Sequence, residues 1–300
     1  MVLVTGGAGF IGSHIAEYLV NHGKKVVVLD NLVSGKLENM ADFAEADDFE
    51  FINGSITDKH LVNQLVKEVD IVFNEAASKC TVCYDDPVLD MMVNGLGTRN
   101  VAEACETHEA MLVHASSGSV MKGYPKSYYG ISKLAGEGYV RQHNGLVYKG
   151  LSNSILRYYH VYGSRQNDSS TGGVIPIFIK QVYNNKPITI FGRGDQVRHF
   201  TSVYDVVKAN MHMLERDMGN TKTVVSANVN VSISKLAEMV QHLMGKKVEV
   251  IHGDPKRGDV FSFDGIFDGR LDIGYIDNFE KELSRTIDWY VNKYNMENAK

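Results

Sequence analysis

The chain has 300 residues and a mass of 33.3 kDa, enough for one large α/β domain or a large domain with a smaller one. Its 44% hydrophobic and 22% charged residues exclude a disordered or collagen-like chain, and its formal charge of −5 disfavours general nucleic-acid binding. No apolar run approaches the roughly 20 residues that cross a bilayer. The first residues, Val2–Val4, form a predicted strand and not a leader. These features predict a cytoplasmic enzyme or binding protein with neither nucleic acid nor membrane as a partner.

The three cysteines suit a reducing compartment. Cys80 and Cys83 form a C-x-x-C pair, a spacing found in zinc sites and in redox centres. A zinc site needs about two more soft ligands, and the remaining cysteine, Cys105, falls on a different predicted element. We therefore predict that the cysteines are ordinary packing residues and that the chain holds no metal.

The first half of the chain alternates short apolar runs with helical patterns. The predicted strands are Val2–Thr5, Lys25–Asp30, Phe49–Ile52, Ile71–Asn74, Met111–Ala115 and Ser154–Arg157. The predicted helices between them include Ser13–His22, Asp58–Val66, Met92–Glu106 and Tyr129–Asn144. Strands alternating with helices of this length form parallel sheets, and near-continuous apolar strands are covered on both faces. The pattern predicts an α/β fold with a doubly wound parallel sheet of the Rossmann type.

The alternation ends after Arg157. Gly163–Val174 is polar and glycine-bearing, as in a loop over a cleft. The later predicted elements are a helix over Pro176–Asn184, a strand and turn over Pro187–Gly194, a return to the first domain over Phe200–Met213, and helices over Ser232–Met244 and about Leu283–Tyr294. We predict a Rossmann domain from residues 1–165 and about 196–226, and a smaller substrate-binding domain from about 166–195 and 227–300.

A glycine motif, Gly6-Gly-Ala-Gly9-Phe-Ile-Gly12, follows the first strand and opens the first helix. Gly6 permits the tight turn, Gly9 lets the backbone approach a pyrophosphate, and Gly12 lets helix and strand pack closely. The helix N-terminus offers N–H groups to the phosphates. Asp30 ends the next strand, 18 residues past Gly12, where a carboxylate accepts hydrogen bonds from ribose hydroxyls and repels a 2′-phosphate. This predicts an NAD site; the alternative is a plain βαβ turn with conformational glycines.

Tyr129 and Lys133 lie four residues apart, on one face of a predicted helix. A free tyrosine has a pKa near 10, and bringing that pKa to neutrality requires about 3 units, or roughly 4 kcal/mol. An ammonium one turn away and a positive nicotinamide ring would supply part of this. The same spacing is common on surface helices, but here it follows a dinucleotide motif and Ser116-Ser117 at the end of a strand. We predict that these residues form a catalytic set.

On these residues the chain resembles the extended short-chain dehydrogenases/reductases, in the nucleotide-sugar epimerase/dehydratase family. The matching segments are Thr5–Ser13, Val27–Asn31, Asn53–Asp58, Phe73–Ser78, Asn94–Asn100, Ala115–Ser119, Tyr129–Glu137, Leu156–Gln166 and Gly192–Asp205. They extend over most of the chain and are more specific for the family than for one reaction.

The resemblance implies a role for each matched residue. Tyr129 would take a sugar hydroxyl proton, Lys133 would hold the nicotinamide ribose, and Ser117 would hydrogen-bond the reacting oxygen. The implied NAD contacts are Gly6, Gly9, Phe10, Ile11, Gly12, Asp30, Asn31, Ser55, Ile56, Ala76, Ala77, Lys79, Asn94, Ser116, Tyr129, Lys133 and Tyr158. Ser55 stands where the family usually has Asp, so we expect one weaker adenine contact.

The resemblance also implies a set of substrate contacts, namely Ser117, His160, Arg198 and Arg257. Arg198 and the pair Lys256-Arg257 resemble the family's diphosphate clamps, and bidentate arginine suits such an anion. The family usually has one more residue between this arginine and Gly-Asp, so Lys256 is the alternative equivalent. His160 stands where Asn is commoner, and its alternative interpretation is a buried core histidine.

The residues after the catalytic serine indicate the reaction. Dehydratases of the family share an Asp-Glu pair there and the UDP-glucuronate decarboxylases carry a Glu, whereas here Gly118 and Ser119 follow Ser117. We therefore expect NAD-dependent 4-epimerisation of a nucleotide sugar, with UDP as the first choice, through a transient 4-keto intermediate. The alternatives are a dehydratase, decarboxylase or keto-reductase of the same family, and a non-catalytic NAD-binding protein.

Two departures from the family pattern bear on the sugar pocket. Met121 replaces a usual tyrosine, and about 11 residues separate Ser117 from Tyr129, about half the usual length. The pocket is therefore expected to be more open or differently shaped.

The helices that begin near Met92 and Tyr129 carry apolar side chains, and in the family this pair forms a four-helix interface. We expect a homodimer.

Overall fold

The structure is a computed structural model that describes residues 1–79, 81–120, 127–143, 153–215, 221–224, 229–255, 269–276 and 278–299. The chain divides into two compact units. The first comprises Met1–Tyr158, Val206–Val224 and Asp268–Ile273, and the second Tyr159–Asp205, Val225–Phe267 and Gly274–Lys300. The sequence placed residues 159–165 and 196–205 in the first domain, whereas here they belong to the second unit.

The first unit is built on a seven-stranded parallel sheet, ordered β11-β6-β5-β4-β1-β2-β3. Its strands are β1 (Val2–Thr5), β2 (Val26–Asp30), β3 (Phe49–Asn53), β4 (Ile71–Asn74), β5 (Met111–Ser117), β6 (Ser154–Tyr158) and β11 (Thr221–Val224). The predicted Rossmann-type sheet is confirmed, and six of its strands coincide with predicted ones. The seventh, β11, was missed because its four residues, Thr-Lys-Thr-Val, form no apolar run.

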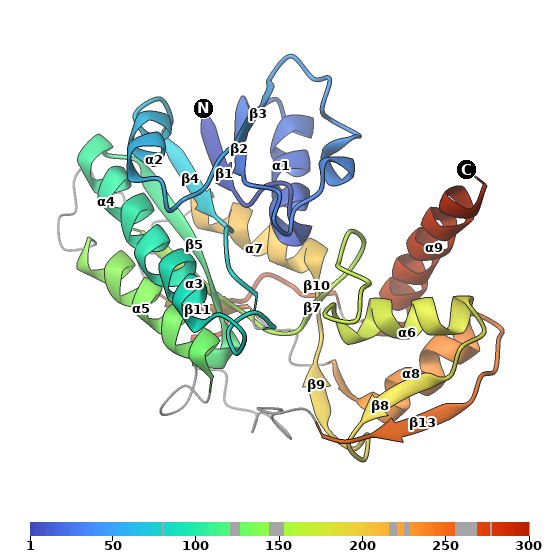
Figure 1. The fold of residues 1–300 in the computed structure, drawn as a ribbon. Coiled ribbons are helices and arrows are strands. Elements are labelled where there is room, and N and C mark those ends of the chain that lie inside the picture. The colour runs from blue at the N-terminus through green and yellow to red at the C-terminus, as the bar shows by residue number, and fades with distance from the viewer. Residues whose placement is uncertain are drawn as a thin grey trace. The chain divides into compact units, whose positions relative to one another are not determined.

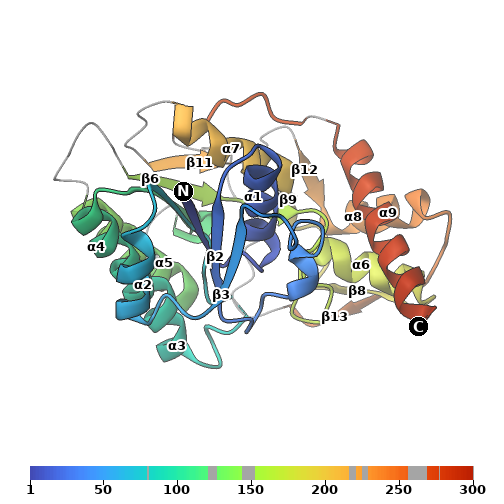
Figure 2. The ribbon, with the colours of Figure 1, turned by 90° about the horizontal axis from the view of Figure 1, so that it is seen from above.

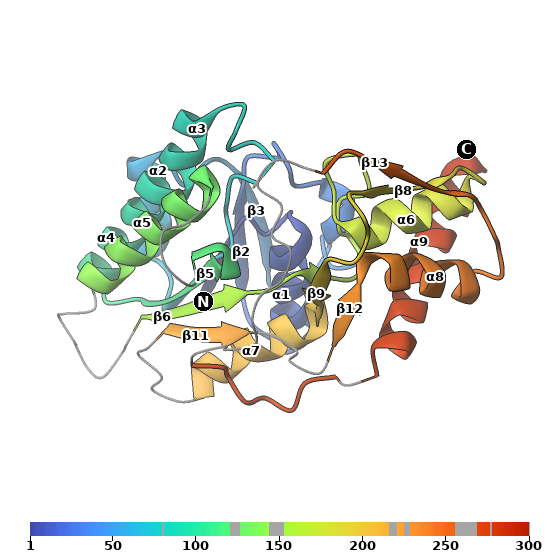
Figure 3. The same cartoon turned by 90° about the horizontal axis from the view of Figure 1, so that it is seen from below.

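Helices cover both faces of this sheet, which explains why β1 and β2 are buried at every residue. The helices of the unit are α1 (Phe10–Asn21), α2 (Lys59–Val66), α3 (Pro87–Met91), α4 (Thr98–His108), α5 (Tyr128–Gln142) and most of α7 (Val203–Glu215). Helices α2, α4 and α5 lie on one face, and α1 and α7 lie on the other (Figures 1, 2 and 3). The core between the sheet and α2, α4 and α5 includes Leu3, Ile155 and the free cysteine Cys105.

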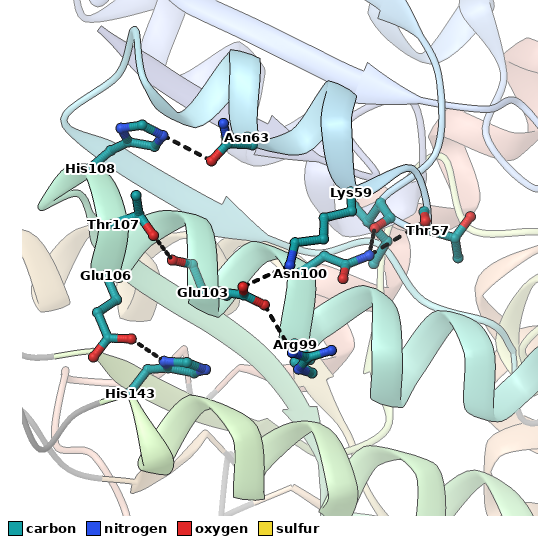
Figure 4. Close-up of polar contacts among 11 residues, drawn as sticks. Thr57, Lys59, Asn63, Arg99, Asn100, Glu103, Glu106, Thr107, His108 and His143 are labelled. Carbon is teal, nitrogen blue, oxygen red and sulfur yellow. Dashed lines mark hydrogen bonds and ion pairs between the residues drawn. The ribbon is translucent and has the colours of Figure 1, made fainter.

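Polar contacts join α2, α4 and α5 on their outer side (Figure 4). Glu103 of α4 pairs with Lys59 of α2 at 2.7 Å and with Arg99 at 3.2 Å. His143, just after α5, pairs with Glu106. Pairs of this kind on the surface contribute about 0–1 kcal/mol each, so the helices are held mainly by the buried core beneath them.

The helix predicted over Met92–Glu106 is broken into two parts. A π-helical turn over Met92–Gly97 follows α3 and leads into α4. Glycines permit close packing there: a Cβ on Gly136 of α5 would lie 2.5 Å from the carbonyl oxygen of Asn94. Single π-turns inside helices occur frequently at functional sites, and this one carries Asn94.

The second unit is smaller and has its own core. Its helices are α6 (Val174–Tyr183), α8 (Ile233–Leu243) and α9 (Phe279–Asn298), and its two-stranded sheets pair β7 (Val161–Tyr162) with β10 (Thr201–Ser202), β9 (Val197–His199) with β12 (Asn230–Ser232), and β8 (Ile188–Phe191) with β13 (Val250–Gly253). The three helices enclose residues such as Phe178, Leu236 and Leu283. Ser232 caps α8 by accepting from the N–H of Lys235 at 3.2 Å.

None of the described helices combines the length and the apolar composition that crossing a membrane requires.

Candidate functional site

The order of the sheet reverses between β1 and β4, and ligands of open α/β sheets bind at such a switch point, beyond the carboxyl ends of the strands. The connections after these two strands pack backbone against backbone: the N–H of Glu75 donates to the carbonyl oxygen of Thr5 at 3.1 Å. Gly6 has φ +66°, and a Cβ on it would lie 2.7 Å from the backbone nitrogen of Ala76. Both the left-handed conformation and the lack of space require glycine at position 6.

Helix α1 begins directly at this switch point, with Gly9 as its N-cap. No side chain caps it, and its first turn, which contains Phe10 and Ile11, has no acidic residue. The N–H groups of this turn and the positive end of the helix dipole therefore meet no competing acceptor from the first turn or the N-cap. A Cβ on Gly12 would lie 2.4 Å from the carbonyl oxygen of Gly6, so this close packing of the helix on the turn requires glycine at position 12. This geometry fits a pyrophosphate group.

Asp30 is fixed at the end of β2 by the turns around it. Its carboxylate accepts from the backbone N–H of Ala8 at 3.1 Å and from that of Leu32 at 2.8 Å. Burial raises the pKa of this carboxyl, and the two backbone hydrogen bonds oppose that rise. A carboxylate has about four acceptor positions, so oxygen lone pairs remain for the hydroxyls of a ribose. Asn31, next in the chain, holds the turn by accepting from the N–H of Val33 at 3.2 Å.

A pair of lysines lies beside the glycine turn. Burial lowers the pKa of Lys79, on the connection after β4, and the charge of Lys36 lowers it further. Lys36 is held near the glycine motif, since its backbone N–H donates to the carbonyl oxygen of Ala8 at 2.9 Å. Two cations that repel each other favour an anion between them. Sequence analysis singled out Lys79 and missed Lys36, because their proximity depends on the sheet order.

The predicted adenine contacts lie after β3. The side chain of Ile56 belongs to the buried core, so its backbone is the part a cofactor could contact. The hydroxyl of Ser55 bonds to that of Thr57 at 2.9 Å. Ala76 and the exposed Ala77 follow β4 on the other side of β1.

The predicted catalytic residues lie at the end of β5 and on α5, whose Lys133 contacts that strand. Lys133 of α5 is 2% exposed, and its ammonium donates to the carbonyl oxygen of Ala115 at 3.0 Å. Tyr129 is half-buried one helical turn before it, in the first turn of α5. Ser117 ends β5, and its hydroxyl accepts from the N–H of Ser119 at 3.1 Å. The structure thus brings Ser117 to the strand end against which the Lys133 face of α5 packs.

A buried carboxylate lies behind this set. Glu137 of α5 is fully buried and accepts from the hydroxyl of Ser116 at 2.7 Å. It also binds Arg157 of β6 through Nε at 2.7 Å and Nη2 at 2.6 Å, and Arg141 at 2.6 Å. Burial raises the pKa of Glu137, but the hydrogen bonds and charges of these partners lower it overall. Ser116 is therefore oriented toward Glu137, which fixes the strand end that carries Ser117.

Asn94, in the π-helical turn, is also fully buried. Its Oδ1 accepts from the N–H of Ser78 at 2.9 Å, and its Nδ2 donates to Asp90 at 3.0 Å and to Ser132 at 3.1 Å. Ser132 in turn donates to Asp90 at 2.5 Å. Asn94 thus joins the connection after β4 to the helix that carries Lys133.

Tyr158 ends β6 and contacts a carboxylate that sequence analysis did not select. Its hydroxyl donates to Glu75 at 2.8 Å and accepts from Asn210 of α7 at 2.8 Å. Burial raises the pKa of the Glu75 carboxyl to about 7, against the effects of the Tyr158 hydrogen bond and the Lys133 charge. An acidic residue directly after a buried strand was the signal available in the sequence.

Of the predicted substrate residues, His160 and Arg198 lie in the second unit. Burial and, after it, the charge of nearby Arg198 lower the pKa of His160 to about 3, so the structure brings these two residues together with a neutral imidazole. His160 has φ +34°, a conformation for which Asn is better suited. Arg198 is buried and donates to the carbonyl oxygen of Val197 at 2.9 Å. Lys256, Arg257 and Met121 lie outside the described residues.

Within the described parts of the chain, no group of three or more His, Cys, Asp or Glu side chains is placed to hold a metal ion. Cys83 and Cys105 are buried, and Cys80 lies outside the described residues.

Comparison with known proteins extends this picture. The model of the NAD dependent epimerase/dehydratase family matches residues 2–227. A protein of Methanocaldococcus jannaschii, named provisionally as a UDP-glucose 4-epimerase, is 37% identical over 277 residues, which are 87% of this chain and 88% of that protein. The UDP-glucose 4-epimerase of Mycolicibacterium smegmatis is 32% identical over 86% of this chain and 87% of its own length. A UDP-N-acetyl-alpha-D-glucosaminuronate decarboxylase of Bacillus cytotoxicus is 28% identical over 96% and 97% of the two chains.

Solved structures agree with these relatives. The UDP-glucose 4-epimerase of Thermus thermophilus in complex with NAD superposes with a TM-score of 0.84 at 32% identity, covering 96% of this chain and 98% of that one. The UDP-N-acetylglucosamine 4-epimerase of Methanobrevibacter ruminantium, in complex with UDP-N-acetylmuramic acid, gives a TM-score of 0.90 at 28% identity over 97% and 98% of the chains.

Proposed function

The chain belongs to the NAD dependent epimerase/dehydratase family, and on this premise we propose that it epimerises C4 of a UDP-sugar. NAD is the cofactor of this family of enzymes. The residues present fit NAD, because the glycine turn and the α1 N-terminus suit a pyrophosphate and Asp30 suits a ribose. The loss of Asp after β3, where Ser55 stands, affects one adenine contact.

The observation that carries the choice of reaction is the absence of an acid beside the catalytic tyrosine. None of the 11 residues between Ser117 and Tyr129 is Asp or Glu. Eliminating water from C5–C6 needs an acid and a base near the sugar, and this segment provides neither as a carboxylate. Removing and returning a hydride at C4 needs one base, and Tyr129 suffices.

Bound NAD supplies a hydride acceptor and donor. The chain's residues would handle the proton: Tyr129, as the tyrosinate, would take it from the C4 hydroxyl and return it after the keto sugar has turned. Lys133, a buried ammonium one turn away, favours the tyrosinate. Ser117 would hydrogen-bond the C4 oxygen, and its own hydroxyl is oriented by the Ser119 N–H. In the second unit, Arg198 and neutral His160 would bind the diphosphate.

A panel of UDP-, GDP-, dTDP- and CDP-sugars, each incubated with the protein and followed by NMR, tests this proposal. A C4 epimer formed with no net change in absorbance near 340 nm is the expected result. A 4-keto-6-deoxy product or loss of carbon dioxide would assign instead the dehydratase or decarboxylase reaction, the latter carried out by one of the relatives. Stoichiometric consumption of NADH would assign a keto-reductase.

We also propose that the protein is a homodimer. An apolar surface lies on α3, the π-helical turn and α5, and its exposed residues are Val88, Leu89, Met92, Leu96, Tyr128, Ile131 and Leu134. Contiguous apolar patches of this kind on an enzyme surface mark interaction sites. A second copy of the chain would cover them through the pair of helices predicted from the sequence.

A further inference from the structure

Glu75 directly follows β4, beside the strand whose backbone anchors Lys133. The register pairs Asn74 of β4 with His114 of β5, so Glu75 comes next, beside Ala115. The carbonyl oxygen of Ala115 holds the ammonium of Lys133. Glu75, Lys133 and Tyr158 therefore meet at the carboxyl ends of three adjacent strands, β4, β5 and β6.

The direction of the hydrogen bonds at Glu75 can be deduced from a backbone carbonyl oxygen, that of Val206, at the start of a series of hydrogen bonds. The carbonyl oxygen of Val206 can only accept, so the atom of Asn210 that contacts it at 2.8 Å is the amide nitrogen. The same nitrogen lies 2.8 Å from the Tyr158 hydroxyl, which must accept from it. The single proton of Tyr158 is then donated to Glu75. This chain of donors favours Glu75 as a carboxylate, because a hydrogen bond to an ionised acceptor is the stronger one.

The other charges around Lys133 are already engaged. Burial lowers the pKa of Lys133 to about 8, and Glu75, Asp90 and Glu137 oppose this, with Glu75 first among them. Glu137 binds two arginines, and Asp90 accepts from Ser132 and Asn94. Glu75 is bound by a neutral phenol, and among the described residues the charge that lowers its pKa is that of Lys133. The neighbouring His114 of β5 is neutral, since burial and the Lys133 charge hold its pKa well below the usual range.

We propose that Glu75 is a positioning residue of this site: its carboxylate, oriented by Tyr158, is the counter-charge that keeps the buried Lys133 amine protonated. The proposal rests on the proposed function, in which the Lys133 ammonium favours the Tyr129 tyrosinate. It adds a fourth side chain to the catalytic set, one that acts through Lys133 and does not touch the sugar.

The test is a direct titration of Lys133 in the NAD-saturated protein. Lysine labelled with carbon-13 at Cε is incorporated, and the Lys133 signal is the one that Lys133→Arg removes. Its shift is followed against pH in wild type, Glu75→Gln and Glu75→Asp. Glutamine keeps an oxygen that accepts from Tyr158, removes the charge and turns the second oxygen into an amide donor, whereas aspartate keeps the charge. Glu103→Gln is the matched control, because Glu103 pairs with Lys59 and Arg99 on the outer surface (Figure 4).

The expected result is a Lys133 midpoint lowered by about one pH unit or more in Glu75→Gln, a smaller change in Glu75→Asp and no change in Glu103→Gln. An unchanged midpoint in Glu75→Gln, or an equal fall in Glu75→Asp, overturns the proposal. If Glu75→Gln does not fold, the wild-type curve decides. It should show a second step near pH 7 from Glu75, and a single step contradicts the inference.

The titration needs no turnover, so the two proposals fail separately. If the protein epimerises a sugar but the titration midpoint of Lys133 is unchanged in Glu75→Gln, only the proposal that Glu75 is the counter-charge is refuted. If the protein epimerises no sugar but the titration midpoint of Lys133 falls in Glu75→Gln, only the proposed reaction is refuted.

Discussion

Replacing Glu137 with Gln tests whether the buried network behind the catalytic set holds the first unit together. The carboxylate is fully buried and is contacted by Ser116, Arg157 and Arg141 at 2.6–2.7 Å. Glutamine has nearly the same shape, but it removes the charge and turns one acceptor into a donor facing an arginine. Arg157, whose side chain is 17% exposed, then loses the carboxylate that it binds through Nε and Nη2.

The magnitude follows from burial. Removing one partner of a buried ion pair costs about 3–5 kcal/mol, because the remaining charge has lost its counter-charge. Whole proteins are stable by about 5–15 kcal/mol, so Glu137→Gln removes a large part of the total. The exposed ion pairs of Glu103 serve as the comparison. Glu103→Gln is expected to lower the free energy of unfolding by at most about 1 kcal/mol, since solvent screens these charges.

Urea denaturation followed by far-UV circular dichroism measures both free energies of unfolding. A double variant, Glu137→Gln with Arg157→Met, should recover part of the loss, because it removes the more buried of the two cations that Glu137 binds, while Arg141, whose side chain is 44% exposed, stays solvated. A cost below about 1 kcal/mol for Glu137→Gln, or no recovery in the double variant, would refute the reasoning that the network compensates buried charge.

Further predictions concern chemistry, cofactor, assembly and acid stability. Tyr129→Phe should lower turnover by a factor of hundreds or more while NAD stays bound, as measured by initial rates and cofactor content. Asp30→Asn should raise the affinity for NADP relative to NAD by about tenfold, about 1.4 kcal/mol, in a binding titration; an unchanged ratio would count against the role of Asp30. Ile131→Glu should convert a dimer into a 33.3 kDa monomer by light scattering. Although burial raises the pKa of Glu137, its partners lower it overall. The stabilisation that Glu137 contributes is therefore complete above about pH 4.3 and is lost as pH falls through the folded pKa. The free energy of unfolding should consequently fall less steeply with acidification in Glu137→Gln than in wild type.

Much of the fold could be predicted because it is encoded over short stretches. The six predicted strands are continuous apolar runs, and a run of this kind has few stable placements other than the middle of a covered sheet. The glycine turn and Asp30 are likewise local, since a strand, a turn and a helix follow one another in the chain. The Tyr129–Lys133 spacing is set by one helical turn.

Other features depend on which strands become neighbours. Strand β11 has no apolar run and is stabilised by pairing with β6 on the sheet edge. The proximity of Lys36 and Lys79 requires β1 to lie between β2 and β4. Glu75 and Tyr158 are 83 residues apart and share a hydrogen bond because β4, β5 and β6 are adjacent.

The sequence by itself therefore determined the dinucleotide turn, the catalytic helix and the class of sheet, because each depends on spacing within a single element or turn. The tertiary structure decided which charges meet around Lys133. Counter-charges act over a few ångströms in space, and no local spacing encodes a distance between residues on separate strands.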